Sequence, residues 1–476
     1  MAQSESGKQS MAHTEYDLVV IGSGPSGEKA AIEAARRHKT VAIVERRSVQ
    51  GGVCLHTGTI PSKTLRETVV YIAGLRQRSV YGLVPPAAPN VTPRELMYRK
   101  DQIIREELEV IRQNMARLGI VVVHGAGRID DPNTVTVTGS DGEQRVLKAA
   151  VIVIATGTVS HRPDHINFDG KFVYDAETIL NLDIIPRTLT IVGGGVIGCE
   201  YASIFSHLGI HVTIVDIRDK LLPFLDNEIA EALSYLMRKY GVSLVLQEHT
   251  EKILIEDDQT VTITRSGRRV VSDRLLYTAG RCGNTGNMGL EALGIAITGG
   301  GLITVNEHYQ TCVPNIYAVG DVIGFPSLAS VSMDQGRLAA IHAFSHSEIS
   351  CLNSLLPLGI YTIPAVSMVG ETEQSLAAAG QDYEIGTARY YELARGQIIN
   401  DHDGMLKIIF EPESKRLLGV HIIGERATEL IHIGQAVMSL GGNLDYFVET
   451  VFNYPTLGEA YKVAALDGLA RLSQRA

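Results

Sequence analysis

A glycine pattern that occurs twice constrains the fold of this chain more than any other feature. The first copy consists of an apolar run at residues 16–21, then Gly22, Gly24 and Gly27, and a second apolar run that ends in Glu45. This order predicts a strand, a tight turn, a helix and a second strand. The glycines allow the backbone to approach a pyrophosphate at the helix N-terminus, and Glu45 is placed to bind a ribose diol.

The second copy lies near the middle of the chain. An apolar run at residues 188–192 leads into Gly193, Gly195 and Gly198, and the next apolar run ends in Asp216. In both copies the acid follows the first glycine by 23 residues. A repeat of this kind predicts two separate adenine-dinucleotide sites on one chain.

Residue patterning outside the two copies completes an α/β chain. Strands are expected at 120–123, 134–138 and 150–154, and helices at 100–118 and 327–344. From about residue 356, short strands at 386–391 and 406–410 alternate with helices at 426–439 and 456–472. This last region lacks a glycine fingerprint and is predicted to be an α+β interface domain.

Composition narrows the class of protein. A chain of 476 residues with a formal charge of −10 and no cluster of Lys and Arg is not expected to bind nucleic acid. No apolar run is long enough to predict a membrane span, and the polar residues 1–15 are predicted to be a disordered tail. The cysteines are scattered, odd in number and without metal-ligand spacing, which indicates a reducing, cytoplasmic location and no metal site. They are Cys54, Cys199, Cys282, Cys312 and Cys351.

Several motifs give the chain a specific resemblance to a known family. In chain order they are VVIGSGPSGEKAA, GGVCLHTGTIPSK, VIVIATG, IVGGGVIGCEYAS, YTAGR, NIYAVGDVIGFPSLA and FNYPTLGEAY. With them the chain resembles the FAD-dependent pyridine nucleotide-disulfide oxidoreductases over nearly all residues after Glu15. The resemblance implies two Rossmann-like, doubly wound domains that bind FAD and NAD(P), followed by a C-terminal α+β dimerisation domain. The implied limits are 16–158 and 287–355 for the two parts of the FAD-binding domain, 159–286 for the NAD(P)-binding domain and 356–476 for the dimerisation domain.

The resemblance also implies roles for individual residues. Lys63 would lie near the flavin N5 atom and stabilise negative charge on the reduced ring, with Glu200 as its ion-pair partner. Without that role, Lys63 would be an ordinary solvated helix residue. The implied FAD-binding residues are Gly22, Gly24, Gly27, Glu45, Gly157 and Asp321. The implied NAD(P)-binding residues are Gly193, Gly195, Gly198, Asp216, Arg218 and Gly280.

Two departures from the family pattern concern the redox chemistry. Disulfide-reducing members carry a second cysteine where this chain has Thr59, five residues after Cys54, and a hydroxyl cannot take part in thiol–disulfide exchange. Those members also carry a His before Pro-Thr as the acid–base, and Tyr454 takes its place here. A phenol, with an ordinary pKa near ~10, is a poor proton carrier at neutral pH. Loss of both groups predicts a reaction that needs neither, such as hydride exchange between a nicotinamide and a flavin.

The motifs GTIPSK, GCEYASIF, YAVGDVIG, ERATELIHIGQA and FNYPT resemble the branch of the family that exchanges hydride between nicotinamide nucleotides. This implies a cytoplasmic homodimer or higher homo-oligomer that binds FAD and catalyses NADPH + NAD+ ⇌ NADP+ + NADH by a ping-pong scheme. NAD(H) and NADP(H) would be its substrates. Asp216 favours NAD, whereas Arg218 and Lys220 can take the 2′-phosphate of NADP. A single NAD site beside a solvated turn is the alternative interpretation.

Three further points stay open on the sequence alone. An NAD(P)H:quinone oxidoreductase would lack the same two groups, because a quinone takes electrons directly from flavin. A flavin-bearing interaction subunit without catalysis is a hypothesis from a different class. Cys54, a catalytic candidate of uncertain role, can be a small buried hydrophobe, or a thiolate or sulfenate at the flavin. For His56, a role as a base competes with ordinary packing.

Overall fold

The computed structural model describes residues 14–76, 82, 91–345 and 354–475. Residues 1–13 of the expected disordered tail lie outside the described residues, as does Cys351. The chain divides into two compact units. Unit 1 consists of Met1–His56, Ile104–Val159 and Arg281–Leu352, and unit 2 consists of Thr57–Ile103, Ser160–Gly280 and Asn353–Ala476. Each of the two glycine fingerprints therefore lies in a different unit.

Unit 1 is built around a mixed β-sheet whose central strands run parallel. The first two strands are buried along most of their length, which is typical of parallel strands covered by helices. The strand order is β3-β2-β1-β6-β5-β4, with β17 paired to β6, so the end of β1 lies in the middle of the sheet. The strands are β1 (Glu15–Ile21), β2 (Val41–Glu45), β3 (Val121–His124), β4 (Ala126–Asp131), β5 (Thr134–Thr138), β6 (Gln144–Ile154) and β17 (Ile316–Ala318).

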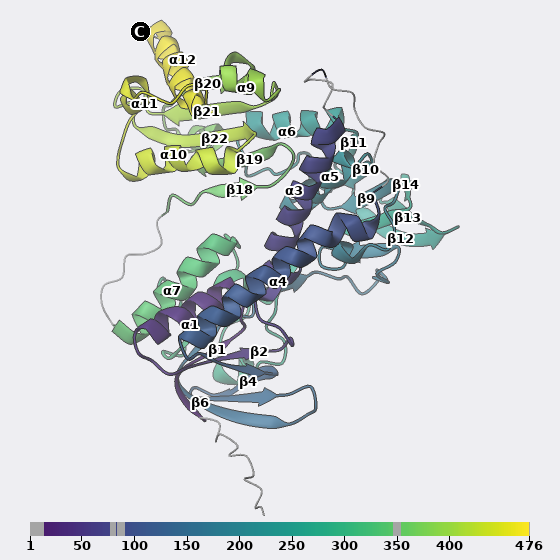
Figure 1. Ribbon diagram of the computed structural model, residues 1–476, viewed down its shortest axis with the longest axis vertical. Helices are drawn as coiled ribbons and strands as arrows, with labels where there is room; N and C mark the ends of the chain where they lie inside the picture. Colours follow the sequence, from purple (N-terminus) through teal and green to yellow (C-terminus); the bar gives the residue numbers. More distant parts are fainter. Residues whose placement is uncertain (1–13, 77–81, 83–90, 346–353, 476) are drawn as a thin grey trace, which may run out of the picture. The chain divides into compact units, whose positions relative to one another are not determined.

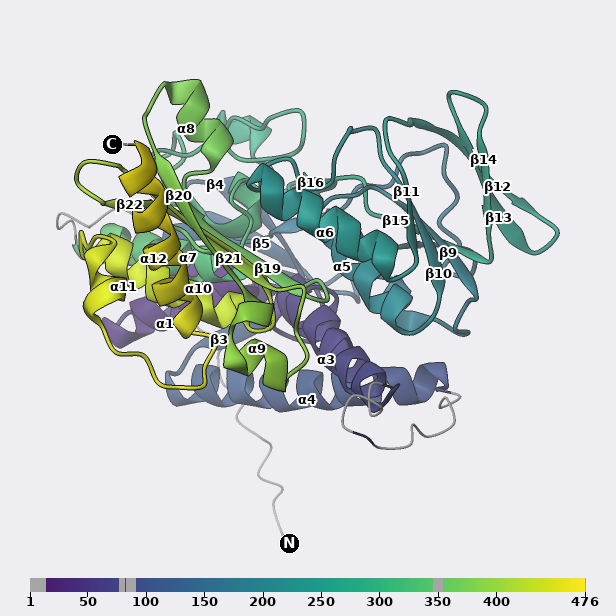
Figure 2. The same ribbon diagram turned by 90° about the horizontal axis from the view of Figure 1, so that it is seen from above.

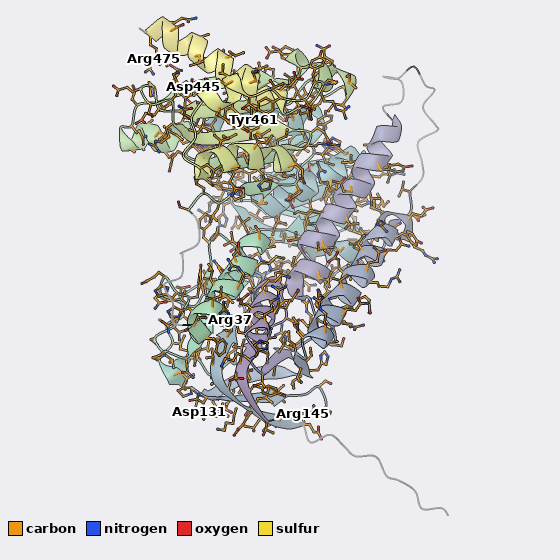
Figure 3. All side chains as sticks on the ribbon, turned by 60° about the vertical axis from the view of Figure 1, so that its left-hand side comes forward. Arg37, Asp131, Arg145, Asp445, Tyr461 and Arg475 are labelled. Atoms are coloured by element: carbon orange, nitrogen blue, oxygen red, sulfur yellow. The ribbon has the colours of Figure 1, made fainter. Side chains whose placement is uncertain are left out.

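Two helices that are far apart in the sequence lie side by side in unit 1 (Figure 1). They are α1 (Pro25–Arg36), which follows the first glycine turn, and α7 (Ala329–Ser345). Just after α1, Arg37, which is labelled in Figure 3, donates a hydrogen bond to the Ser345 hydroxyl at 2.7 Å. The short helices α2 (Gly52–His56) and η4 (Gly320–Ile323) also belong to this unit. The helix of the first fingerprint thus packs against a helix from near residue 340 within the same unit.

The first part of unit 2 contains a second parallel sheet, in the order β11-β10-β9-β15-β8. Its strands are β8 (Val173–Asp175), β9 (Thr188–Val192), β10 (His211–Val215), β11 (Val242–Val245) and β15 (Arg274–Tyr277). The helices are α3 (Thr59–Arg76), α5 (Val196–His207) and α6 (Asn227–Lys239), and α3 packs against α5. An antiparallel sheet is formed by β12 (Thr250–Glu256), β13 (Gln259–Thr264) and β14 (Arg269–Ser272). The long helix α4 (Pro93–Arg117) contributes residues to both units.

The C-terminal part of unit 2 is an antiparallel sheet in the order β18-β19-β22-β21-β20. Its strands are β18 (Leu358–Ile360), β19 (Ala365–Gly370), β20 (Glu384–Arg389), β21 (Met405–Phe410) and β22 (Leu417–Gly424). Its helices are α8 (Glu373–Ala379), α9 (Ala394–Ile398), α10 (Ala427–Ser439), α11 (Asp445–Glu449) and α12 (Glu459–Arg475). Figure 2 shows α10 and α12 beside this sheet. The buried Tyr461 of α12, labelled in Figure 3, donates to the Leu430 carbonyl of α10 at 2.8 Å and ties the two helices together.

A mixed sheet and a parallel sheet with helices, followed by a C-terminal α+β region, confirm the expected fold class. The expected helix at 100–118 is longer at its start, because α4 begins at Pro93. Residue patterning set no bounds for helix α3, although a helix was the alternative setting considered for Lys63; this helix packs against α5. No helix among the described residues is both long enough and apolar enough to cross a bilayer.

A buried ammonium group joins the two parts of unit 2. Lys407 on β21 is fully buried, and its Nζ lies 2.9 Å from Asp226 and 3.3 Å from Glu228, and also contacts Glu373. Burial alone would lower the pKa of Lys407, but the hydrogen bonds to Asp226 and Glu373 raise it above its usual value. These three carboxylates lie close enough together to hold a metal ion, but here they surround an ammonium group. Lys407 and these carboxylates thus form an ionic contact between the start of α6 and the C-terminal sheet.

Replacing Lys407 by Met is expected to lower the free energy of unfolding by about 3–5 kcal/mol, because the buried carboxylate of Asp226 would lose its partner. The matched control is Lys239→Met, which removes a more exposed pair with Asp403 at 2.6 Å and should cost about 0–1 kcal/mol. Urea unfolding of both variants measures the difference. Equal losses in the two variants would contradict the role assigned to Lys407.

The effect of Lys407→Met should also depend on pH. Burial alone would raise the pKa of Asp226, but the hydrogen bond from Lys407 and other contacts hold it below its usual value. The folded pKa therefore lies below the unfolded pKa of about 3.9, and the stabilisation is present above about pH 4 and lost as the pH falls through the folded pKa. The difference in stability between wild type and variant should narrow as the pH drops below about 4.

Candidate functional site

The two glycine turns have the same geometry. The first glycine of each turn has a positive φ, 108° at Gly22 and 107° at Gly193, which favours glycine strongly over other residues. A β-carbon on the third glycine would collide with the carbonyl oxygen of the first, at 2.0 Å for Gly27 and 1.9 Å for Gly198. Each helix therefore begins directly against the end of its strand.

The middle glycine of each turn faces open space. No atom lies within 4 Å of a β-carbon placed on Gly24, and for Gly195 the nearest atom is a guanidinium nitrogen of Arg218 at 3.9 Å. Both glycines are in extended conformations that other residues also adopt, so the turn itself does not require glycine there. Open space at a helix N-terminus allows backbone amides to donate hydrogen bonds to a phosphate.

Glu45 lies at the end of β2 and is 6% exposed. The Ser23 amide donates to its Oε2 at 3.1 Å, the Ser23 hydroxyl donates to the same oxygen, and the Arg47 amide donates to Oε1 at 2.8 Å. The amide of Gly51 in turn donates to the Ser23 hydroxyl at 3.0 Å. The glycine turn thus fixes the orientation of the carboxylate, which keeps further lone pairs available to accept from ribose hydroxyls.

Asp216 has the equivalent place at the end of β10 and carries an additional cation. The Gly194 amide donates to Oδ2 and the Arg218 amide donates to Oδ1 at 2.8 Å. The Arg218 guanidinium binds both oxygens, with Nε 2.8 Å from Oδ1 and a terminal nitrogen 2.6 Å from Oδ2. Burial alone would raise the pKa of Asp216, but these hydrogen bonds hold it below its usual value. Lys220 does not take part, since its Nζ lies 2.7 Å from Asn227.

Asp321 in unit 1 belongs to a small polar network. It accepts from the Thr158 hydroxyl at 3.4 Å and from the Ser332 hydroxyl at 3.3 Å. Arg281 donates from Nε to the Thr158 hydroxyl at 2.8 Å and from a terminal nitrogen to the Thr158 carbonyl at 2.9 Å. Gly157 precedes this network with a φ of 65°. The network orders the residues that follow β6 and β17.

The residues of unit 1 fit an adenine dinucleotide such as FAD. The Thr156 hydroxyl is buried without a hydrogen-bond partner, and a β-carbon on Gly22 would lie 3.2 Å from the Thr156 amide nitrogen. An unsatisfied buried hydroxyl beside the glycine turn is a group that a bound ligand can satisfy. The open space at Gly24 fits a pyrophosphate and the fixed carboxylate of Glu45 fits a ribose, so these residues are compatible with an ADP moiety.

In unit 2, Lys63 of α3 and Glu200 of α5 form an ion pair with 2.6 Å between Nζ and Oε2. The Glu200 side chain is 7% exposed and that of Lys63 is 25% exposed. The other oxygen of Glu200 accepts from the Tyr361 amide at 2.9 Å, and the Tyr361 ring centroid lies 5.0 Å from the Lys63 ammonium. Lys63 also borders a cavity of about 560 Å³ that residues of α3 and α4 line.

The remaining sequence candidates have more ordinary surroundings. Cys54 is a half-buried residue of α2 in unit 1, whereas Thr59 is the first residue of α3 in unit 2. A ring nitrogen of His56 lies 2.7 Å from the Gln50 carbonyl oxygen, which fits packing. Tyr454 is 74% exposed.

Of the other expected positions, Gly280 accepts from the His161 amide at 3.1 Å. Cys199 is fully buried, and burial raises the pKa of its thiol far above the usual value, so it is not a nucleophile.

Four residues of these networks were missed on the sequence. Thr158 follows the predicted strand at 150–154, and Arg281 follows the buried strand β15. The end of a buried strand is a usual position for ligand-binding residues, so that signal could have found them. Tyr361 and Lys407 had no such signal, because their charged partners lie far away in the sequence.

Comparison with known proteins identifies the family. Residues 16–336 match the family model described as pyridine nucleotide-disulphide oxidoreductase, and residues 356–465 match the dimerisation domain of that family. A soluble pyridine nucleotide transhydrogenase of Mycobacterium bovis is 48% identical over 96% of this chain and 98% of its own length. Proteins with the same description from Yersinia enterocolitica and Colwellia psychrerythraea are 44% and 43% identical, over 97% and 96% of this chain and 99% of their own lengths.

Solved structures show the same fold. LpdA of Mycobacterium tuberculosis has a TM-score of 0.88 and 25% identity, over 95% of this chain and 99% of that chain. The HOCl-induced flavoprotein disulfide reductase RclA of Escherichia coli has a TM-score of 0.84 and 27% identity, with the same coverage of both chains. The chain belongs to the pyridine nucleotide-disulphide oxidoreductase family.

Proposed function

We propose that this protein catalyses reversible hydride transfer between NADPH and NAD+ with FAD as its bound cofactor. The observation that carries the proposal is the presence of two complete dinucleotide fingerprints in a chain that has Thr59 where a relay cysteine would be needed. Relatives at 43–48% identity that are named soluble pyridine nucleotide transhydrogenase support it. Two nucleotides would use the unit 2 site in turn, which gives a ping-pong scheme.

FAD would bind to unit 1. Its ADP part would lie at the first turn, with the pyrophosphate at Gly24 and the ribose at Glu45, and Asp321 and Gly157 would lie near the rest of the cofactor. FAD, when bound, accepts a hydride from one nicotinamide and returns it to another. The proposed limits of this domain are residues 16–158 and 287–355, with the nucleotide-binding domain at 159–286.

Lys63 would stabilise negative charge that develops on the reduced ring, as the family resemblance implies. What supports this role is that Glu200 holds its ammonium group at 2.6 Å while leaving it partly exposed. A fixed cation needs no reorganisation when the charge develops. We further propose a homodimer formed through residues 356–476 and a cytoplasmic location, which the family's dimerisation domain and the name of the relatives support.

Asp216 and Arg218 would allow the unit 2 site to accept both nucleotides. Backbone amides of Gly194 and Arg218 hold the carboxylate even without the guanidinium, so the Arg218 side chain can leave it without exposing an unsatisfied acid. With NADP(H), the guanidinium would bind the 2′-phosphate in a bidentate manner. With NAD(H), Asp216 would accept from the ribose hydroxyls.

The purified protein is expected to reduce thio-NAD+ with NADPH, and double-reciprocal plots at several fixed concentrations of one substrate should give parallel lines. Dihydrolipoamide and glutathione should not be turned over, because Thr59 cannot exchange with a disulfide. Measured activity with either compound, or intersecting lines, would contradict the proposal.

Faster turnover of a quinone at the same NADPH concentration would favour a quinone oxidoreductase instead, and a flavin that NADPH fails to bleach would indicate a non-catalytic subunit.

The variants Gly24→Ala and Gly195→Ala should separate the two dinucleotide sites. Both should fold, because each added methyl group has free space in the protein. Gly24→Ala should bind FAD at least about tenfold more weakly, since the methyl group would occupy the path of the pyrophosphate. Gly195→Ala should keep its flavin and lose nicotinamide nucleotide affinity instead. Flavin absorbance per chain and calorimetric titration measure the two effects, and full flavin content in Gly24→Ala would count against the assignment.

Arg218→Ala should weaken NADP+ binding by about tenfold to a hundredfold, which corresponds to loss of a charge-assisted bidentate contact. NAD+ binding should stay the same or become tighter, because Asp216 is then free of its intramolecular partner. Lys220→Ala is the matched control and should change either affinity by less than about threefold, since Lys220 contacts Asn227. Calorimetric titration of the oxidised enzyme gives both constants. If Arg218→Ala weakened the binding of NAD+ and NADP+ equally, the proposed move of Arg218 from Asp216 to the 2′-phosphate would be ruled out.

A further inference from the structure

The C-terminal part of unit 2 supplies a third group to the Lys63–Glu200 pair. Tyr361 directly follows β18, and its contacts go to both charged residues: the backbone amide to Glu200 and the ring to Lys63. Glu200 therefore uses one oxygen for each partner, Oε2 for the ammonium group and Oε1 for the amide. The ammonium group is held between a carboxylate and an aromatic face.

We propose that Tyr361 is a positioning residue for hydride transfer, whose ring fixes the location of the Lys63 ammonium group. This inference rests on the proposed function, because the role of Lys63 toward the flavin does. Tyr361 itself need not touch either substrate. Its contribution is to keep a flexible lysine in one place.

The need for such a contact follows from the surroundings of Lys63. Its Nζ has a close partner in Glu200 and a longer contact of 3.4 Å to the Ser62 hydroxyl. A lysine has a flexible stem of four carbons, and this one is partly exposed beside a cavity, so its head group can turn away into water. A cation over the face of an aromatic ring is attracted by the ring quadrupole, more strongly when both are partly removed from water.

Tyr361 is itself held by the two helices that carry the ion pair. Arg66 of α3 donates to the Thr362 carbonyl at 3.0 Å, and the amide of Ile363 donates to the Ser203 hydroxyl of α5 at 3.2 Å. The short segment 361–363 is thus fixed to α3 and to α5. Burial and the nearby carboxylates of Glu200 and Glu429 raise the pKa of the Tyr361 phenol, so the ring stays neutral.

The test first removes the Tyr361 ring and then keeps an aromatic ring while changing only its quadrupole. Tyr361→Leu should slow reduction of the flavin by NADPH about 3- to 30-fold, the range for a cation–π contact at a partly desolvated site, and should shift the flavin midpoint potential to a more negative value. Tyr361→Phe should restore most of both quantities, because it keeps the ring and loses only the hydroxyl. Placing phenylalanines with one, two and three ring fluorines at position 361 should lower rate and potential step by step, since fluorine weakens the quadrupole at nearly constant size.

The matched control is Tyr71→Leu, which removes an exposed aromatic residue from the same helix α3 and should leave the potential unchanged. A merely structural role of Tyr361 would give a flat fluorine series, and that result would overturn the proposal. The midpoint potential is measured without nicotinamide turnover, so it tests the role of Tyr361 separately from the proposed function. A flat series in an active transhydrogenase rejects the role of Tyr361, whereas an inactive enzyme with a graded potential rejects only the proposed function.

Discussion

Each nucleotide site depends on a helix that starts so close to the end of its strand that the third glycine cannot carry a side chain. This contact fixes where the first turn of α1 and of α5 begins. One amide of each turn, from Ser23 or Gly194, also holds the acid at the end of the next strand, while the space beside the middle glycine stays open. The place for a phosphate and the place for a ribose are therefore set by one backbone approach.

The parts of the fold that the sequence predicted are those set by local chemistry. The two strand–turn–helix–strand units were predicted within a residue or two, because apolar runs, glycines and a terminal acid all lie within about 30 residues. Helix α3 was not given as an element, because its β-branched residues, such as Val69, weaken the local helix signal, and contact with α5 adds support that lies outside the segment. The same limit applies to the site, where Tyr361 contacts Lys63 from nearly 300 residues away and no pattern near either residue indicates the contact.

The chain retains the cation of the family pattern while it lacks the relay thiol and the C-terminal base. A thiol relay requires two sulfur atoms that can meet, and a proton carrier requires a suitable pKa, whereas a fixed charge requires only firm support. The support is extensive here: Glu200 binds the Lys63 ammonium group, the Tyr361 ring lies beside that group, and the Tyr361 amide holds Glu200. These surroundings fit the proposed role of Lys63, which is to supply a fixed positive charge.

The buried Lys407 has a consequence for how this protein can change during evolution or engineering. Its partners come from the start of α6 and the start of α8, and the lysine itself comes from β21. A chimera that joins the nucleotide-binding part of this chain to a C-terminal part without a lysine at the place of Lys407 would leave buried carboxylates without a counter-charge. The two parts look separable in sequence, but for recombination they behave as one module unless Asp226 and Lys407 are exchanged together.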